Sequence, residues 1–156
     1  MTTEDYINVG RLRTLGYIKA VQDNDLLLDN HLIIKVEDTH GSDEAGPELE
    51  NSIAAAFNKN NKIDGIFAVN EIYAGAALRV LRRLGKAIPS DVGLICFTDG
   101  LISKYSYPPL TTVKQHAEEM GKTAAAKLIE RLENDDENLK YEQKVIKSII
   151  IEREST

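Results

Sequence analysis

Short, largely apolar runs of strand length alternate with amphipathic helical stretches along most of this chain. Such runs occupy residues 63–69 and 92–97, and between them apolar side chains in residues 71–84 repeat every four positions. A short apolar run is typical of a buried strand, whereas a repeat near 3.6 residues is typical of a helix that buries one face. The alternation predicts an α/β fold with a doubly wound, mostly parallel sheet.

Local signals set the boundaries of the expected elements. Asn70 is suited to cap the helix that follows it, and Gly85 is suited to end that helix in a left-handed conformation. Pro108 and Pro109 cannot continue a helix or a central strand, so they mark a change of direction. Residues 142–151 carry strand patterns that suit an edge pair or a hairpin. We expect helices at residues 3–23, 71–84 and 116–132, and one that begins at residue 47 and ends between residues 58 and 62. We expect strands at residues 31–36, 63–69, 92–97 and 110–114, and a polar loop at residues 37–46.

The chain carries 19 Lys and Arg against 25 Asp and Glu, which gives a net charge of −6. An acidic protein repels the phosphate backbone of DNA, so this chain alone is predicted to be a poor DNA binder. A cluster of basic residues is a candidate phosphate-binding patch. We favour the alternative that these residues interact with the negative end of a helix dipole and with solvent. The cluster consists of Arg79, Arg82, Arg83 and Lys86.

Cys96 is the only cysteine in 156 residues, so no disulfide can form within the chain. It lies in an apolar run, where a cysteine usually behaves as a small hydrophobic side chain. A reducing, cytoplasmic compartment is the simpler expectation. No apolar run reaches the ~18 residues of a membrane span, and residues 1–20 carry charges where an export signal needs an apolar segment. We expect neither membrane insertion nor export.

No catalytic or cofactor-binding motif is present: the glycine patterns of dinucleotide and phosphate-binding loops are absent, and no serine lies in a nucleophile elbow. His31, His40 and His116 are scattered without the spacing of metal ligands. We therefore expect no metal, no cofactor and no catalytic residue. An unrelated α/β enzyme that works by acid–base chemistry is the least favoured alternative. Its candidate carboxylates are Asp38, Glu71 and Asp99.

Three loops follow predicted strands, at residues 37–41, 70–73 and 98–103. In open α/β sheets, ligands bind in the crevice outside the carboxyl ends of the strands. A ligand site also needs fixed hydrogen-bonding groups, which strand ends supply. These loops are therefore the candidate site loops.

Several segments occur in an order typical of one family. They are RTLGY at residues 13–17, IDGIFAVNEIYAGAAL at 63–78, LGKAIPSDV at 84–92, PPLTTVKQ at 108–115, Met-Gly at 120–121 and IIERES at 150–155. In this order they resemble the LacI/GalR family of bacterial transcription regulators. The resemblance implies a partial sensor core of the periplasmic-binding-protein-like type I fold, in which two α/β subdomains hold a small molecule, often a sugar or a purine. Binding would change the subdomain angle, and with it the way a dimer presents its DNA-binding heads.

Three residues match ligand-site positions of that family. Arg13 matches a cleft arginine whose planar guanidinium can hold vicinal hydroxyls or a carboxylate, although an arginine here also suits a surface helix. Asn70 matches a ligand-contacting asparagine, and one side chain can both contact ligand and cap a helix. Gln115 matches a residue near the crossover between subdomains, where the alternative is an ordinary polar residue before a helix.

Four further candidate ligand-binding residues depart from the family pattern. Glu71 stands where the family usually has aspartate, and Thr98 replaces the usual ligand-binding aspartate. Asp99 lies one place further on, and Asp38 falls where relatives often have an aromatic platform. The resemblance therefore implies a cleft whose polar groups differ from those of most relatives.

The resemblance places residues 1–116 and 148–156 in the C-terminal subdomain and residues 117–147 in a remnant of the N-terminal subdomain. Relatives begin with a helix-turn-helix and the first half of the core, including a central strand, and residues 1–156 contain no counterpart of these segments. DNA binding is therefore expected only through that missing helix-turn-helix. The helix at residues 116–132 would lack its usual partner, so we expect a homodimer or a higher oligomer. A solute-binding protein of the same fold is the alternative, disfavoured because no export signal is seen.

Overall fold

A computed structural model of the chain describes residues 2–3, 8–36, 46–134 and 142–156. Its larger sheet has four strands in sequence order: β3 (Gly65–Ala68), β4 (Gly93–Cys96), β5 (Thr111–Lys114) and β6 (Ile149–Ile151). The first three strands run parallel, and β6 pairs antiparallel with β5. The sheet is therefore mixed and mostly parallel, which confirms the predicted α/β class.

Strands β3 and β4 are paired in register over their whole length. Gly65 is opposite Gly93 and Ala68 is opposite Cys96. The backbone N–H of Phe97 also donates to the carbonyl of Ala68 at 2.8 Å. The two strands therefore end together, and the residues that follow them lie at one edge of the sheet.

Helices α2 (Pro47–Lys59) and α3 (Glu71–Arg83) supply much of the hydrophobic core. Both lie where the sequence predicts helices, and α3 packs on α2, β3 and β4. Cys96 is fully buried, as its apolar run predicts. The buried hydrophobic residues of α2 and α3 are Leu49, Ile53, Phe57, Tyr73, Ala74, Ala76, Ala77, Val80 and Leu81.

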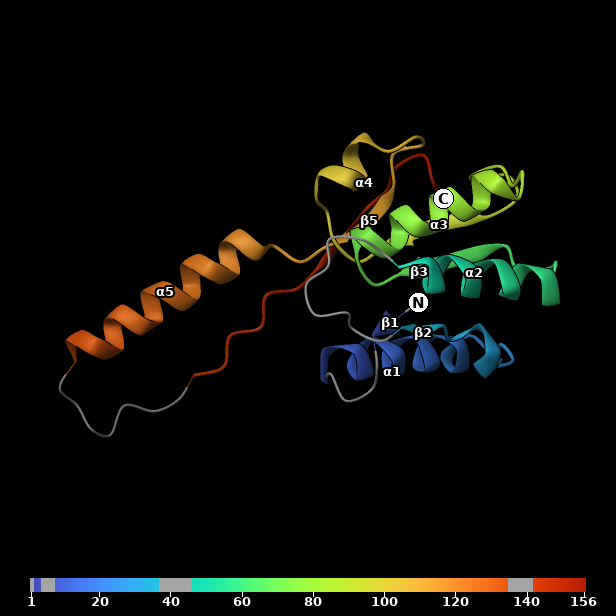
Figure 1. Cartoon of the computed structure of the whole chain (residues 1–156). Helices are drawn as coiled ribbons and strands as arrows, with labels where there is room; N and C mark the ends of the chain where they lie inside the picture. The colour runs from blue at the N-terminus through green and yellow to red at the C-terminus, as the bar shows by residue number, and fades with distance from the viewer. Residues whose placement is uncertain (1, 4–7, 37–45, 135–141) are drawn as a thin grey trace.

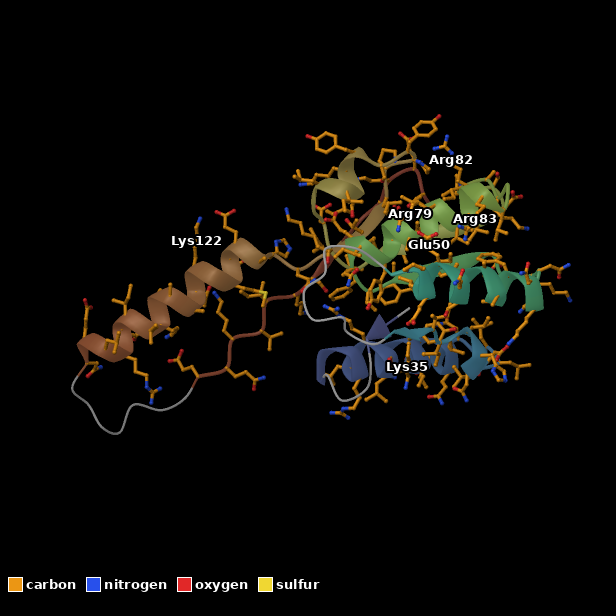
Figure 2. The ribbon with its side chains drawn as sticks, in the orientation of Figure 1. Lys35, Glu50, Arg79, Arg82, Arg83 and Lys122 are labelled. Atoms are coloured by element: carbon orange, nitrogen blue, oxygen red, sulfur yellow. The ribbon has the colours of Figure 1, made fainter. Side chains whose placement is uncertain are left out.

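Two ion pairs join α2 to α3. Glu50 binds Arg79 Nε at 2.7 Å and Arg83 Nη1 at 3.3 Å (Figure 2). The hydrogen bond from Arg79 is the main reason why the pKa of Glu50 lies below its ordinary value. Two members of the basic cluster thus pair with a carboxylate of the neighbouring helix, a partner that the sequence did not predict.

The first part of the chain differs from the prediction. The helix expected from residue 3 begins later, as α1 (Asn8–Asp23), and Thr2–Thr3 forms β1. Of the strand expected at residues 31–36, only Lys35–Val36 forms a strand, β2, which pairs in parallel with β1 in a separate two-stranded sheet. The Asp29 side chain accepts the backbone N–H of His31 at 2.9 Å and caps the 3-10 helix Asn30–Leu32. This local bond competes with strand formation.

The last part of the chain is partly as predicted. Helix α5 (Ala117–Glu133) forms where expected and extends away from the sheet (Figure 1). The short helix α4 (Leu101–Tyr105) falls in a predicted loop. Residues 142–148 form no strand, so only β6 remains of the strand patterns at residues 142–151. The loop predicted at residues 37–46 lies outside the described residues except for Gly46. Among the described helices, none has the length and apolar character to cross a membrane.

Candidate functional site

The carboxyl ends of β3 and β4 bring together residues from three parts of the sequence. Asn70 follows the end of β3 and Thr98 follows the end of β4, and the register of the two strands makes them neighbours at one edge. Arg13 reaches this edge from α1, because its Nη1 donates to the carbonyl of Val69 at 3.2 Å. This edge of the sheet is the candidate site.

Arg13 also contacts an aromatic ring at this edge. Its guanidinium carbon lies 4.8 Å from the centroid of the Phe97 ring, within the range of a cation–π interaction. Phe67 packs edge-on against Phe97, with 6.3 Å between the ring centroids. Burial lowers the pKa of Arg13 from its ordinary value. Sequence reasoning missed Phe97 as a site residue, because the apolar run that contains it looked like an ordinary buried strand.

Asn70 caps α3, as its position predicts. Its Oδ1 accepts a hydrogen bond from the backbone N–H of Tyr73 at 2.8 Å. Within the described residues its side-chain amide nitrogen donates no hydrogen bond. Because the cap uses only the oxygen, the nitrogen remains available to a ligand.

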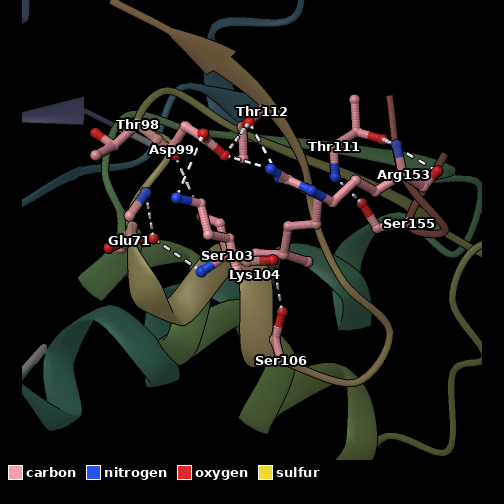
Figure 3. A network of polar contacts seen from close by, with 12 residues as sticks. Glu71, Thr98, Asp99, Ser103, Lys104, Ser106, Thr111, Thr112, Arg153 and Ser155 are labelled. Carbon is pink, nitrogen blue, oxygen red and sulfur yellow. Dashed lines mark hydrogen bonds and ion pairs between the residues drawn. The ribbon is translucent and has the colours of Figure 1, made fainter. Parts of the chain in front are cut away.

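Glu71 binds the backbone of the loop after β4. Its Oε1 accepts hydrogen bonds from the N–H groups of Gly100 at 3.0 Å and Ser103 at 2.8 Å (Figure 3). A Cβ added at Gly100 would lie 2.7 Å from Glu71 Cδ, so a side chain here would require Glu71 or the loop to shift. Sequence reasoning missed this role, since the partners are separated by at least 29 positions.

Asp99 belongs to a network that joins β4, β5 and the end of the chain (Figure 3). Its carboxylate accepts from Arg153 at 2.5 Å and from Thr112 Oγ1 at 3.1 Å, and Lys104 lies 3.9 Å away. Arg153 also donates to the carbonyl of Leu110 at 2.6 Å. Burial disfavours the charged carboxylate, but the hydrogen bonds from Arg153 and Thr112 outweigh it and lower the pKa of Asp99.

The other predicted residues make few contacts that connect them to the site. The hydroxyl of Thr98 donates to the carbonyl of Phe97, and the residue is half-buried. Gln115 is also half-buried, between β5 and α5. Asp38 lies outside the described residues. The structure thus brings Arg13, Asn70 and Thr98 to one edge of the sheet. Glu71 and Asp99 lie beside this edge and bind protein groups. Gln115 lies at the start of the linker to α5.

Ser155, in the closing segment of the chain, binds the backbone of two neighbouring strands. Its hydroxyl accepts from the N–H of Thr111 at 2.8 Å and donates to the carbonyl of Leu94 at 2.5 Å. Ser155 therefore bridges β4 and β5 at the point where their pairing begins. Thr111 is the first paired residue of β5, and Leu94 directly precedes Ile95, the first residue of β4 that pairs with β5. The C-terminal residues therefore tie β4 and β5 together and, through Arg153, hold Asp99.

A cavity of about 120 Å³ lies between α1, α2 and β3. Its walls are largely apolar and include Ile33, Phe57 and Ile66. Arg13 is the only charged residue among those described in its lining. The cavity therefore places Arg13 beside a largely apolar hollow.

The described residues offer little to a metal or a nucleophilic reaction. Across residues 2–3, 8–36, 46–134 and 142–156, no group of three or more His, Cys, Asp or Glu could hold a metal ion. Burial raises the pKa of the Cys96 thiol to about 11, so the thiolate form is scarce near neutral pH. The arrangement at the edge of the sheet is suited to holding a polar molecule by hydrogen bonds and one positive charge.

The sequence matches the family described as periplasmic binding protein-like domain over residues 3–156. The transcriptional regulator MalR of Clostridium butyricum is 30% identical over 149 residues, which are 96% of this chain and 42% of MalR. The ribose operon repressor of Haemophilus influenzae is 27% identical over 148 residues, which are 95% of this chain and 42% of the repressor. The chain spans less than half the length of these curated relatives.

Solved structures of regulators share the fold. A periplasmic binding protein/LacI transcriptional regulator from Alkaliphilus metalliredigens, in complex with D-xylulofuranose, superposes with a TM-score of 0.77 at 28% identity. The match covers 100% of this chain and 55% of that one. A sugar-binding LacI-family regulator from Escherichia coli, in complex with phosphate, gives a TM-score of 0.81 at 25% identity, over 99% of this chain and 52% of that one. The similarity confirms the predicted periplasmic-binding-protein-like fold.

Proposed function

Because this chain belongs to the periplasmic binding protein-like domain family, we propose that it is the effector-sensing part of a LacI-type transcriptional regulator. It binds a small molecule at the carboxyl ends of β3 and β4. The observation that carries the proposal is the convergence of Arg13, Asn70 and Phe97 at that edge, where one bond and one ring contact fix the guanidinium. The regulatory names of the relatives support the same function.

The site residues divide into two roles. Arg13, Asn70 and Thr98 contact the effector, with Asp38 and Gln115 at the margin of the cleft. Glu71 and Asp99 act as positioning residues, because each is bound to protein groups that fix the loop after β4. The effector is a sugar or related metabolite, in keeping with the sugar complex of the Alkaliphilus relative.

The effector acts by shifting a population of conformations. A ligand changes an equilibrium only by its difference in affinity for the two states, so the cleft must fit the effector better in one subdomain arrangement. Residues 1–116 and 148–156 form one subdomain in this proposal, and residues 117–147 belong to the other. In the complete regulator, a helix-turn-helix supplies DNA binding, which is what the names of several relatives describe. The regulator acts in the cytoplasm.

The chain associates as a homodimer through α5. No residue of this helix is buried, and Met120, Leu128 and Leu132 are 49%, 59% and 75% exposed. An apolar stripe on a helix is stabilised when a second surface covers it. A second copy supplies such a surface with a symmetric interface.

Ligand-induced stabilisation tests the proposed function. Cellobiose, D-ribose and D-xylulose are added separately to the chain, and the melting temperature is followed by fluorimetry while NMR follows the sugar. We expect a rise in melting temperature with at least one sugar and no chemical change in it, because binding to the native state stabilises it by mass action. Conversion of the sugar would instead show an enzyme, and an unchanged melting temperature with all three sugars would contradict the proposed sugar sensing.

A further inference from the structure

The apolar cavity between α1, α2 and β3 lies beside the candidate site and differs from it in chemistry. Its volume is about 120 Å³. Ile53, Phe57 and Val69 form its buried wall. The lining residues that come from α1 and from the segment before β2 are half-buried. The cavity is therefore closed on the side of the hydrophobic core and can be reached from the side of α1.

An apolar cavity of this kind is a potential ligand site for energetic reasons. Side chains that face an empty space lack contact atoms on that side and lose dispersion energy. An apolar molecule of matching size restores those contacts and is itself removed from water. In another protein, an apolar cavity of about 150 Å³ stays dry and binds benzene or xenon. The cavity of this chain has a similar size, so ligands of the same class fit it.

The polar groups of the lining offer an occupant little hydrogen bonding. Arg13 Nη1 donates to the carbonyl of Val69 at 3.2 Å, and Thr14 Oγ1 donates to the carbonyl of Gly10 at 3.1 Å. Gly65, at the start of β3, is exposed, so its backbone is accessible to bulk water. A water molecule needs roughly two to four polar partners to stay in a cavity. The described lining therefore favours an apolar occupant over water or a sugar.

Aromatic side chains in the lining indicate the shape of that occupant. Tyr17, Phe57 and Phe67 contribute rings to the walls. Rings pack against one another in edge-to-face and offset arrangements, which add to the energy of burial. Phe67 already makes an edge-on contact with Phe97, and Arg13, the charged residue of the described lining, lies 4.8 Å from the same ring. A single aromatic ring therefore suits this lining.

We propose that the cavity is a second binding site of the chain, for a small uncharged molecule with one aromatic ring. It adjoins the edge of the sheet that is the candidate site for the effector, because Arg13 and Phe67 line the cavity and also contact residues of that edge. Its ligand has the opposite chemistry, since the walls of the cavity are largely apolar. Which effector the chain senses does not affect this second site.

Binding of small apolar molecules to the full chain tests the proposal. The probes are benzene and toluene, with naphthalene as a larger aromatic molecule and cyclohexane as a ring of similar size without aromatic character. Ligand-observed NMR and isothermal titration measure the affinities. We expect benzene and toluene to bind in about the millimolar range or more tightly, and naphthalene about tenfold more weakly, because a second ring overfills the cavity. Cyclohexane should bind severalfold more weakly than benzene, because it lacks the ring–ring contacts.

Matched variants locate the ligand. Ala56→Leu places a larger side chain in the lining and is expected to lower the affinity for toluene by about tenfold or more. Ala55→Leu adds the same atoms at an exposed position of α2 and should bind toluene like the parent chain. Ile66→Ala enlarges the cavity, so naphthalene should then bind about tenfold more tightly than it binds the parent. This gain keeps the proposal testable if Ala56→Leu does not fold.

Three results oppose the proposal in different ways. A chain that binds neither benzene nor toluene overturns it and leaves the sensing of a sugar effector standing. Equal affinities of Ala56→Leu and Ala55→Leu for toluene place the ligand on another surface and also overturn it. Cyclohexane that binds as tightly as benzene overturns the aromatic preference, and with it the ligand class.

Discussion

The carboxylate of Glu71 in α3 accepts a hydrogen bond of 2.8 Å from the backbone N–H of Ser103 in α4. The N–H groups at the start of a helix have no partner within that helix, and a carboxylate is a favourable acceptor for them. Glu71 therefore holds the short helix α4, and with it the loop after β4, against the beginning of α3. The loops that follow β3 and β4 are thus joined into one rigid edge.

Replacement of Gly100 by alanine is expected to break this connection. The added Cβ would lie 2.7 Å from Glu71 Cδ, so the side chain or the loop must move. We expect the free energy of unfolding, measured with urea, to fall by about 1–3 kcal/mol. Gly75→Ala, where no atom lies within 4 Å of the added Cβ, is the control and should stabilise α3 by up to about 1 kcal/mol. Equal effects at the two positions would show that Glu71 does not restrict Gly100.

Asp99→Asn is expected to lower the stability in a pH-dependent manner. The ionised carboxylate binds Arg153 and Thr112, and its side chain is 8% exposed, so we expect a loss of about 1.5–3 kcal/mol at neutral pH. Because the folded-state pKa of Asp99 is lowered, this contribution is fully present above the ordinary aspartate pKa of about 4 and is lost as the pH falls through the lower folded-state value.

Urea unfolding of the two proteins at several pH values between about 7 and 3 checks this pH dependence. The difference in stability between the parent and Asp99→Asn should shrink toward the acid end. Asp23→Asn removes an exposed pair with Lys19 and should change stability by at most about 0.5 kcal/mol at any of these pH values. A difference that grows on acidification would mean that Asp99 is protonated more readily in the folded chain than in the unfolded one.

Two substitutions at Asn70 separate its role as a helix cap from its role in ligand binding. Asn70→Ala removes the acceptor for the Tyr73 N–H and should cost about 1 kcal/mol of stability. Asn70→Asp keeps that acceptor, so thermal unfolding should be nearly unchanged. Both variants lose the amide N–H donors and should bind the effector more weakly in calorimetry. Undiminished binding by Asn70→Asp would exclude the amide nitrogen from the site.

Leu128→Glu is expected to weaken the proposed dimer. This side chain is 59% exposed on α5, and a charge placed there opposes burial against a second copy. Sedimentation equilibrium at micromolar concentrations should show dimers for the parent chain and a shift toward monomers for the variant. Ala126→Glu adds the same charge to an exposed position on the opposite side of the helix and should leave the dimer intact. A parent chain that is monomeric throughout would remove α5 as a dimer interface.

The sequence alone determined the elements whose signals are local. The periodic apolar residues and the Asn70 cap predicted α3, and Pro47 with its acidic first turn marked the start of α2. The apolar runs predicted β3 and β4 for the same reason, since burial on both faces requires a continuous apolar segment. Propensity and capping act within a few residues, so they can be read without knowing the neighbours in space.

The tertiary structure decided what depends on partners far apart in the chain. Arg153 lies 54 residues from Asp99 and binds it only because β6 returns beside β5. Phe97 contacts Arg13 only because the fold brings this side chain of α1 to the residues that follow β3 and β4. Of the strand expected at residues 31–36, only two residues form a strand, because the Asp29 side chain caps a 3-10 helix at Asn30–Leu32. Sequence patterns record which side chains need partners. Which groups become those partners follows from chain topology, which brings distant residues within hydrogen-bonding distance.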